Sequence, residues 1–367
     1  MKRKTSFFVA LILCAALLTA CTQGAGDVSS ATTSSVQEES TQQPADTSSG
    51  TDDAADPSGA ADSSDTLARV VYDSKGNEIE VPKQVDSIIS LAPSTTQLLI
   101  DLGVADRIVA TDTYSAADYA DELPAGIPAF DMMNPDNEQI VALSSDLVFT
   151  TGMSYSWGED VFASARDAGV TIIDIESAAS LQEIMEQIVF IGECVKEKEA
   201  AEEIAQEMEA FLAEVKTLTE EADPAVRKRV LFELSTPTAD FPTIYSVGPG
   251  SYIDEILTLI GAENVAHDTD SPWITLTEEA AIACNPDVIL STDNYTPDVE
   301  QVLLTLSGWE NVSAVQNKEV YLIDADRINR PNHRVCGSIL EIGLLLYPEL
   351  FEQLTAPFVE EALPDAA

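Results

Sequence analysis

Apolar residues recur at helical spacing over a long stretch near the middle of the chain, residues 180–222, which contains no proline and one glycine. The stripe lapses between Val195 and Ile204, so the pattern predicts a shorter helix, a break near residues 196–198, and a second helix of about 25 residues. Such a helix would span about 35–40 Å. The spacing could also begin a coiled coil, but it lasts only about two heptads. A spine between two halves of the chain is therefore the preferred interpretation.

Short apolar runs alternate with helical patterns on both sides of this spine, which is typical of parallel sheets covered by helices. A hairpin is predicted first, at residues 67–81. The other predicted strands are residues 87–91, 108–111, 127–130, 147–151, 171–175, 229–234, 288–291 and 320–323. The predicted helices are residues 96–102, 136–143, 158–168, 252–259, 276–283, 297–306 and 339–347. Ser94 or Thr95 is expected to cap the first of these helices, and Tyr114 and Tyr119 are expected in a loop.

Two segments of the first half resemble two segments of the second. Glu138 and Asp146 are eight residues apart in a helix-to-strand segment, and the same step separates Glu279 from Asp287. A second pair of segments, each with a glycine between a helix and a strand, occurs in the same order: residues 98–108 and 256–265. These matches predict two like lobes, with a small-molecule site in the cleft between them at the carboxyl ends of the strands.

The first 21 residues have the features of a targeting segment: three basic residues, an apolar run, and Leu-Thr-Ala-Cys at the cleavage site. Leu-x-Ala-Cys resembles the bacterial lipobox, which implies that Cys21 is lipidated and anchors the protein outside the cell membrane. An ordinary secretory cleavage that leaves Cys21 as a thiol is the alternative. The Ser-, Thr- and Asp-rich residues that follow cannot bury a core, so they are expected to form a disordered tether. The predicted organisation is 1–21 signal, 22–66 tether, 67–178 N-terminal lobe, 179–224 helical linker, 225–355 C-terminal lobe and 356–367 tail.

Composition excludes several functions. The formal net charge is -46, from 64 acidic and 18 basic residues, so no basic patch for nucleic acid is expected. His267 and His333 lie outside any metal-binding spacing, and the common catalytic motifs are missing, so neither a metal site nor an enzyme is expected. Cys194, Cys284 and Cys336 allow at most one disulfide, with buried free thiols as the equal alternative.

Several short segments resemble the solute-binding lipoproteins of ABC importers, in particular the group that takes up iron–siderophore complexes, haem and cobalamin. The resemblance covers about residues 70–351. It rests on these segments, taken together and in this order: residues 89–94, 134–138, 146–148, 250–255, 285–289, 330–331 and 347–351. The resemblance implies two Rossmann-like α/β lobes with central parallel sheets, joined by a single long helix, as in class III periplasmic binding proteins. It also implies a monomer that delivers its ligand to a permease and its ATPase. No cofactor is expected beyond the iron or cobalt of the ligand itself.

The resemblance gives two glutamates a role. Proteins of this group carry one exposed Glu at the tip of each lobe, which pairs with Arg on the permease, and Glu138 and Glu279 occupy the matching positions. Each also lies in the first turn of a predicted helix, where the helix dipole alone favours a carboxylate.

The resemblance also implies an aromatic ligand site. Tyr114 and Trp273 fall where cobalamin binders place aromatic residues against the corrin, and Trp273 is expected in a loop. Four further aromatic residues lie in loops that should face the cleft, where ordinary packing is the alternative role: Phe130, Tyr155, Trp157 and Tyr295. Aromatic walls suit a flat and mostly neutral macrocycle.

Two other ligands remain open at this point. Siderophore binders often present Arg to an anionic iron complex. Arg330 and His333 lie in a basic cluster that could meet such a charge, or could only neutralise Asp324 and Asp326. Met133 matches a haem ligand of some relatives, and Tyr295 stands near the place of the absent histidine partner. A two-lobed extracytoplasmic sensor or enzyme is the alternative class.

Overall fold

The computed structural model describes residues 68–73, 76, 78–155, 160–220, 227–238 and 241–359. The predicted signal segment, the tether and most of the tail lie outside these residues. No helix in this described part is long and apolar enough to cross a membrane.

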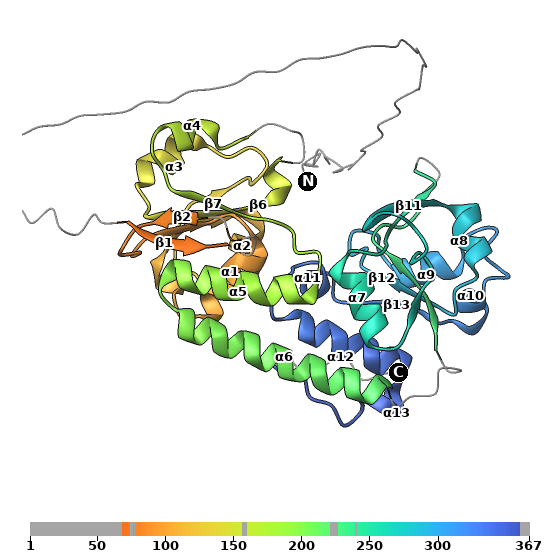
Figure 1. Cartoon of the computed structure of the whole chain (residues 1–367). Coiled ribbons are helices and arrows are strands. Elements are labelled where there is room, and N and C mark those ends of the chain that lie inside the picture. Colours follow the sequence, from red (N-terminus) through yellow and green to blue (C-terminus); the bar gives the residue numbers. More distant parts are fainter. Residues whose placement is uncertain are drawn as a thin grey trace, which may run out of the picture. The chain divides into compact units, whose positions relative to one another are not determined.

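The N-terminal lobe contains a hairpin and a five-stranded parallel sheet in the order β5-β4-β3-β6-β7 (Figure 1). The hairpin pairs Arg69 with Val81, as predicted. The strands are β1 Arg69–Tyr72, β2 Glu78–Val81, β3 Ile88–Ser90, β4 Ile108–Asp112, β5 Ala129–Phe130, β6 Leu147–Thr151 and β7 Ile172–Ile175. The helices are α1 Pro93–Asp101, α2 Thr113–Asp118, α3 Asn137–Leu143 and α4 Ala163–Asp167.

The C-terminal lobe has a four-stranded parallel sheet in the order β10-β8-β12-β13 and an antiparallel ribbon of β9 and β11. The strands are β8 Arg229–Glu233, β9 Thr243–Val247, β10 Glu263–Asn264, β11 Trp273–Thr277, β12 Val288–Ser291 and β13 Val320–Leu322. The helices are α7 Tyr252–Leu259, α8 Glu278–Cys284, α9 Val299–Leu304, α10 Ser313–Asn317, α11 Ala325–Ile328, α12 Val335–Leu346 and α13 Pro348–Phe351. The two α/β sheets confirm the predicted fold class.

The predicted helix pair between the sheets is also present, as α5 (Leu181–Val195) and α6 (Lys198–Glu220). The break falls at Lys196, whose φ of 68° ends α5 in the left-handed conformation. Because only two residues join the helices, they approach closely, and a Cβ on Gly192 would lie 2.2 Å from Cβ of Ala201. The coiled-coil alternative is wrong, because α6 packs against α5, α7 and α12 of the same chain.

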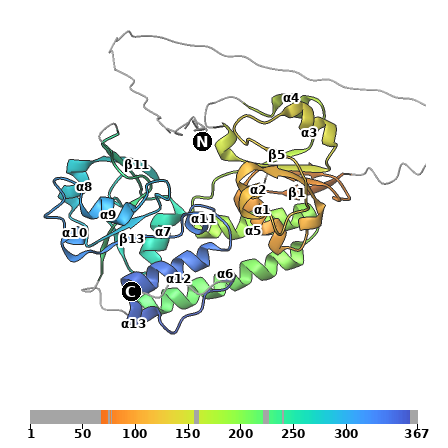
Figure 2. The same cartoon turned by 180° about the vertical axis from the view of Figure 1, so that it is seen from behind.

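The two ends of α6 are fixed to different lobes (Figures 1 and 2). Next to its first turn, Glu197 accepts a hydrogen bond at 2.8 Å from Arg107 of the N-terminal lobe. Near its last turn, Thr219 donates to the carbonyl of Leu259 in α7 at 2.8 Å. This helix therefore crosses from one lobe to the other, as the spine interpretation requires.

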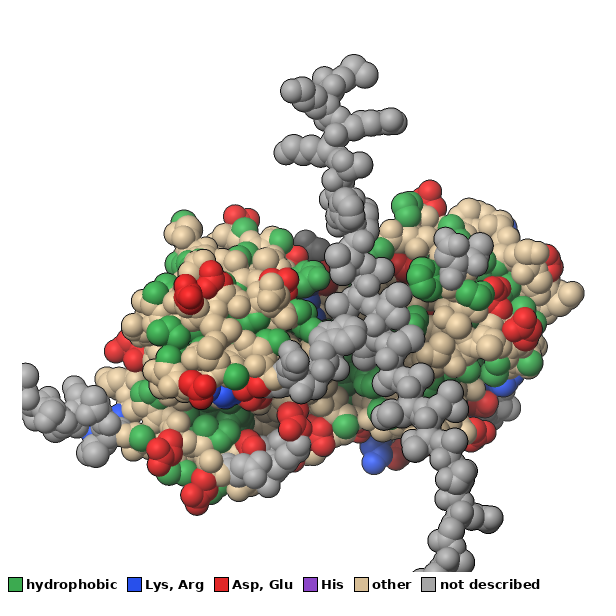
Figure 3. All heavy atoms as spheres, turned by 90° about the horizontal axis from the view of Figure 1, so that it is seen from above, with side chains coloured by type: hydrophobic (Ala, Val, Ile, Leu, Met, Phe, Trp, Pro, Cys, Tyr) green, Lys and Arg blue, Asp and Glu red, His purple; other side chains and the backbone are tan. Residues whose placement is uncertain are grey.

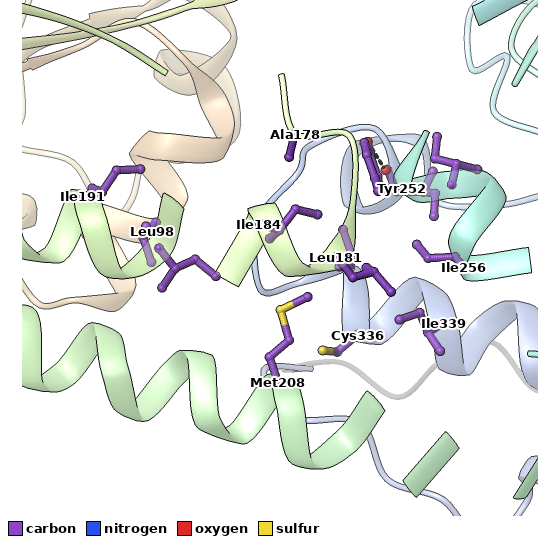
Figure 4. Close-up of a cluster of buried hydrophobic side chains, with 14 of the residues drawn as sticks. Leu98, Ala178, Leu181, Ile184, Ile191, Met208, Tyr252, Ile256, Cys336 and Ile339 are labelled. Carbon is purple, nitrogen blue, oxygen red and sulfur yellow. Dashed lines mark hydrogen bonds between the residues drawn. The ribbon is translucent and has the colours of Figure 1, made fainter. Parts of the chain in front are cut away.

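One hydrophobic core extends from the first sheet, through α5 and α6, to the second sheet. Figure 4 shows its centre, where Leu181 and Ile184 of α5 lie among side chains from α1, α6, α7 and α12. Each lobe has a further apolar cluster on the other face of its sheet, one around Phe162 and one around Trp309. The inner faces of both lobes thus share a single core.

The internal repeat predicted from the sequence has a structural basis. Asp146 accepts a hydrogen bond from the backbone N–H of Ser87 at 2.9 Å, just before β3. Asp287 accepts from the N–H of Arg229 at 3.0 Å, at the start of β8. In each lobe the carboxylate thus joins the helix-to-strand segment to the first strand of the sheet, so α3 and β6 correspond to α8 and β12.

Three local predictions are wrong. Helix α1 begins after Ala92 with no side-chain cap, because Pro93 occupies its first turn and needs no partner for an N–H. The segment expected as a loop around Tyr114 is helix α2, whose N-cap is Asp112. Trp273 begins strand β11 instead of lying in a loop, because it pairs with Val247 of the ribbon that the sequence pattern did not reveal.

Candidate inter-lobe site

A buried aspartate organises the turn that carries Tyr114. Asp112 ends β4, and its Oδ1 accepts hydrogen bonds from the backbone N–H groups of Tyr114 and Ser115, both at 2.9 Å. Its Oδ2 accepts from the hydroxyl of Ser115, whose oxygen lies 3.1 Å from the hydroxyl oxygen of Thr96. Burial raises the pKa of Asp112, although these hydrogen bonds oppose the shift. The turn is therefore fixed while the Tyr114 side chain stays 56% exposed.

A second aspartate organises the turn that carries Tyr295. Asp293 lies two residues after β12, and its Oδ1 accepts from the N–H groups of Tyr295 at 3.0 Å and Thr296 at 3.1 Å. Its Oδ2 accepts from the Thr296 hydroxyl at 2.7 Å and from the N–H of Thr236 at 2.9 Å. Burial works to raise the pKa of Asp293, but these hydrogen bonds prevail and lower it. The phenol of Tyr295 is 82% exposed.

The two tyrosines come from different lobes, and ionisation of Tyr295 would act on Tyr114. Partial burial raises the pKa of Tyr114, and the charged forms of Tyr295 and Asp131 raise it further. Asp131 belongs to the turn of Met133, since its Oδ1 accepts from the Met133 N–H at 2.9 Å. Each lobe thus presents one exposed tyrosine in a turn organised by an aspartate, and the half-buried Met133 lies in a third such turn of the N-terminal lobe.

The other predicted aromatic residues differ in their surroundings. Trp273 is 49% exposed at the start of β11. Phe130 is buried at the end of β5 in the apolar cluster around Phe162, so the prediction that it faces the cleft from a loop is wrong: its ring packs in the core of its lobe. Trp157 and the side chain of Tyr155 lie outside the described residues.

Arg330 is held by Asp118 and Tyr119 of the N-terminal lobe and by Asp326 of its own lobe. Its Nη2 contacts the carboxylates of Asp118 and Asp326, the second at 2.7 Å. Its Nη1 donates to the phenol oxygen of Tyr119 at 2.8 Å, and its guanidinium carbon lies 5.8 Å from the centre of that ring. Arg327 pairs in the same way with Asp324 at 3.0 Å. The neutralising role considered for this cluster is the one that these contacts support.

His333 and Arg334 form a second link between the lobes. Nε2 of His333, which is fully buried, lies 2.7 Å from Oδ2 of Asp101 at the end of α1. Arg334 contacts both oxygens of the same carboxylate, at 2.8 and 3.0 Å. Burial works to raise the pKa of Asp101, but His333 and Arg334 prevail and lower it. We call this three-residue set the interlobe latch.

Glu233 is a buried carboxyl group at the carboxyl end of β8. Among the described residues, neither of its oxygens has a hydrogen-bond partner, and the hydroxyl oxygens of Thr236, Ser246 and Thr292 are buried and unpaired as well. Burial raises the pKa of Glu233 from its ordinary value of 4.5 to about 7. The nearby hydroxyls of Ser291 and Thr236 oppose that shift only in part. The carboxyl group is therefore neutral over much of the acidic range.

Replacing Glu233 with Gln should change how stability depends on pH. An unfolded chain ionises Glu233 above about pH 4.5, whereas the folded chain keeps the proton up to about pH 7. The native protein therefore loses stability as the pH rises through this window, by about 3 kcal/mol in total. Glu233→Gln should remove that loss in urea unfolding between pH 4 and pH 8. The exposed Glu203→Gln serves as control, and equal pH dependence in both variants would contradict the assignment.

Glu138 and Glu279 occupy the same place in α3 and α8. Each is the second residue of its helix, each is exposed, and each helix lies on the side of its lobe away from α6 (Figure 1). The helices end at equivalent positions too, with Ser144 and Asn285 in the left-handed conformation. Seen from this side, acidic side chains are spread over the described surface of both lobes (Figure 3). The geometry is that of two matched, solvent-exposed carboxylates.

The three predicted thiols are all free. Burial raises the pKa of Cys194 to about 12 and raises that of Cys336 as well. These two thiols therefore stay protonated, and neither is a candidate for metal binding or exchange. Among the described residues, no cluster of three metal-ligating side chains occurs.

A hollow outside the inter-lobe face lies between α5 and α6. Its volume is about 730 Å³, and no residue of the predicted ligand site lines it. Its wall combines apolar side chains with five carboxylates: Asp73, Glu186, Glu193, Glu202 and Glu209. It is therefore separate from the site between the tyrosines.

The sequence reasoning missed the residues that hold this site in place. Asp112, Asp293 and Asp101 were not singled out, although each accepts at least three hydrogen bonds and the first two are buried. A signal for two of them was present in the sequence, because Thr-Asp-x-Tyr followed by Ser or Thr occurs at residues 111–115 and again at 292–296. The latch had no such signal, since Asp101 lies more than 230 residues before His333 and Arg334.

Two α/β lobes on one shared core form the architecture that is typical of two-lobed solute-binding proteins. The chain belongs to the periplasmic binding protein family, whose model matches residues 88–327. Two of its relatives are named as a substrate-binding lipoprotein and as a vitamin B12-binding protein.

Particular relatives agree with this assignment. The chain is 28% identical over 283 residues to an uncharacterized ABC transporter substrate-binding lipoprotein, YvrC, of Bacillus subtilis, covering 77% of this chain and 87% of that protein. It is 24% identical over 266 residues to the vitamin B12-binding protein of Vibrio cholerae, covering 71% and 89%. A crystal structure of a possible iron-binding periplasmic solute-binding protein from Staphylococcus epidermidis matches with a TM-score of 0.63 at 25% identity, covering 72% and 100%. The chain is thus a binding protein of the periplasmic type, and its Bacillus relative is named as the substrate-binding lipoprotein of an ABC transporter.

Proposed function

We propose that this protein captures cobalamin between its lobes and delivers it to the permease. The observation that carries the proposal is a contrast in the side chains of the inter-lobe region. Aromatic residues of both lobes, Tyr114, Tyr295 and Trp273, are exposed, whereas the basic residues nearby are bound to carboxylates. Exposed aromatic rings suit a large and largely uncharged corrin ring.

An anionic iron–siderophore complex would need cations, which makes it the weaker candidate. Arg330 bonds to two carboxylates, and Arg334 and His333 share a third, so recruiting any of them would leave a partly buried acid uncompensated. The same reasoning applies to haem, whose propionates carry negative charge. The B12-binding relatives support the choice, although they are only 24% identical.

The proposal includes an anchor and a docking surface. Cys21 would carry the lipid, residues 22–66 would serve as a tether, and Glu138 and Glu279 would pair with arginines on the permease. An exposed carboxylate on each lobe supports the docking role, because paired rim charges orient an encounter and accelerate it.

A fluorescence titration with cyanocobalamin tests the ligand. Trp309 is buried in the C-terminal lobe and Trp273 is exposed, so we expect ligand binding to change the emission of Trp273. We expect saturable quenching with an affinity tighter than about 1 μM, and Trp273→Phe should remove part of the signal.

Haemin and a ferric catecholate siderophore serve as competing ligands in the same titration. Binding of cyanocobalamin alone, or at least about tenfold tighter than the others, supports the proposal. If haemin or the siderophore binds more tightly than cyanocobalamin, that compound becomes the assigned ligand in place of cobalamin. A silent titration with all three would remove the ligand assignment and leave the family assignment intact.

A further inference from the structure

The same five-residue motif carries both exposed tyrosines. Thr111 to Ser115 reads Thr-Asp-Thr-Tyr-Ser, and Thr292 to Thr296 reads Thr-Asp-Asn-Tyr-Thr. In both, the aspartate side chain accepts from the N–H groups two and three residues later and from the hydroxyl three residues later. The local structure is therefore repeated as well as the sequence.

This recurrence is not explained by the internal repeat of the two lobes. The repeat pairs β6 with β12, through Asp146 and Asp287, and it pairs the segment before β4 with the segment before β10. The motif instead follows β4 in one lobe and β12 in the other. Because non-equivalent strands carry the same turn, a shared demand on the two tyrosines explains it better than common descent of the lobes.

We propose that Asp112 and Asp293 are positioning residues that hold Tyr114 and Tyr295 as a paired clamp, one phenol for each side of a flat macrocycle. This inference rests on the proposed function and specifies how the two tyrosines are positioned to contact the ligand. Each carboxylate fixes the backbone of its tyrosine, so little more than the two side-chain torsions of the ring is left to order on binding. A pre-organised turn lowers the entropy cost of capture and so increases affinity.

The two halves of the clamp differ in how firmly they are held. Asp293 also accepts from the N–H of Thr236, which follows β8, so its turn is tied to a second strand segment. The turn of Asp112 is tied through Ser115 to Thr96 of α1. Both aspartates are buried and do not reach the exposed surface, so they act through the tyrosines and not by touching the ligand.

A double-mutant cycle read by cyanocobalamin affinity tests the clamp. Asp112→Ala and Tyr114→Ala should each weaken binding about tenfold, and the double variant should bind no more weakly than Tyr114→Ala alone. The same relation should hold for Asp293→Ala and Tyr295→Ala. Asp112→Asn keeps an acceptor for the two backbone N–H groups, so it should restore most of the affinity even if the alanine variant folds poorly.

Ser180→Ala is the matched control, because it removes an N-cap hydrogen bond from α5 without touching either tyrosine. It should lower Tm and leave the dissociation constant unchanged. Unchanged affinity in both aspartate variants, or losses that simply add in the double variants, would overturn the clamp. If the wild-type protein does not bind cyanocobalamin but binds haemin or the siderophore, only the assignment of cobalamin is rejected. The double-mutant cycle is then measured with the compound that binds. If none of the three compounds binds, both the ligand assignment and the clamp are rejected.

Discussion

Replacing Glu138 and Glu279 together with Ala should abolish cobalamin uptake by cells while leaving cobalamin affinity unchanged. Both carboxylates are exposed, have no side-chain partner among the described residues, and lie on the first turn of matched helices. They contribute little to stability, so their removal should act on docking. Losing both charges should slow productive encounter with the permease at least tenfold. The measurement is uptake of labelled cobalamin in cells that lack the native chain.

The control for this experiment is a second pair of exposed glutamates with the same change in charge. Glu203 and Glu214 lie on the exposed side of α6, away from α3 and α8. Glu203→Ala with Glu214→Ala should transport normally, and each single variant at Glu138 or Glu279 should be intermediate. Normal uptake by the Glu138 and Glu279 double variant would refute the docking role.

Replacing Asp101 with Ala should cost about 3 kcal/mol of unfolding free energy and lower Tm by several degrees. Asp101 is the only described carboxylate that contacts both His333 and Arg334, and His333 is fully buried. Removing it leaves two polar groups of the C-terminal lobe without their partner in the N-terminal lobe. The interlobe latch would then be open, and thermal unfolding with and without ligand measures the loss.

Dependence on pH distinguishes the latch from a general packing defect. The folded pKa of Asp101 is lowered, so its stabilisation is present above the unfolded value of about 3.9 and is lost as the pH falls through the folded value. The difference in stability between wild type and Asp101→Ala should therefore shrink below about pH 4. Glu263→Ala, which breaks an exposed pair with Arg229, should cost less than about 1 kcal/mol at any pH. A cost of similar size in both variants would contradict the latch.

The parts of the fold that could be predicted from the sequence are those encoded in local periodicity. The break at Lys196, the parallel strands and the lobe repeat all follow from apolar spacing and from glycines such as Gly103 and Gly261, which end helices with φ of 76° and 82°. The ribbon of β9 and β11 escaped prediction, because every residue of β11 is at least partly exposed and its alternation of Ile274 and Leu276 with threonines covers only five residues.

The candidate site was only partly predictable, for a different reason. Exposed aromatic residues such as Tyr114 and Tyr295 can be proposed from sequence, since a large apolar ring in a polar segment is unusual. Whether Arg330 is free to bind a ligand could not be predicted from the sequence. Its charge is balanced by Asp118, which lies more than 200 residues earlier in the chain. Whether a cation is available to a ligand depends on such tertiary contacts and not on the local composition.

The shared core has a consequence for how this protein fails. Because α5 and α6 pack beneath both sheets, neither lobe has a complete hydrophobic core of its own. Cutting the chain between α6 and β8 would therefore leave two fragments with exposed hydrophobic faces. The lobes should therefore melt in a single calorimetric transition, unlike domains that are joined by a linker. Damage anywhere along α5 would then inactivate the whole receptor at once, and ligand bound at the tyrosines would protect residues as distant as α13 from proteolysis.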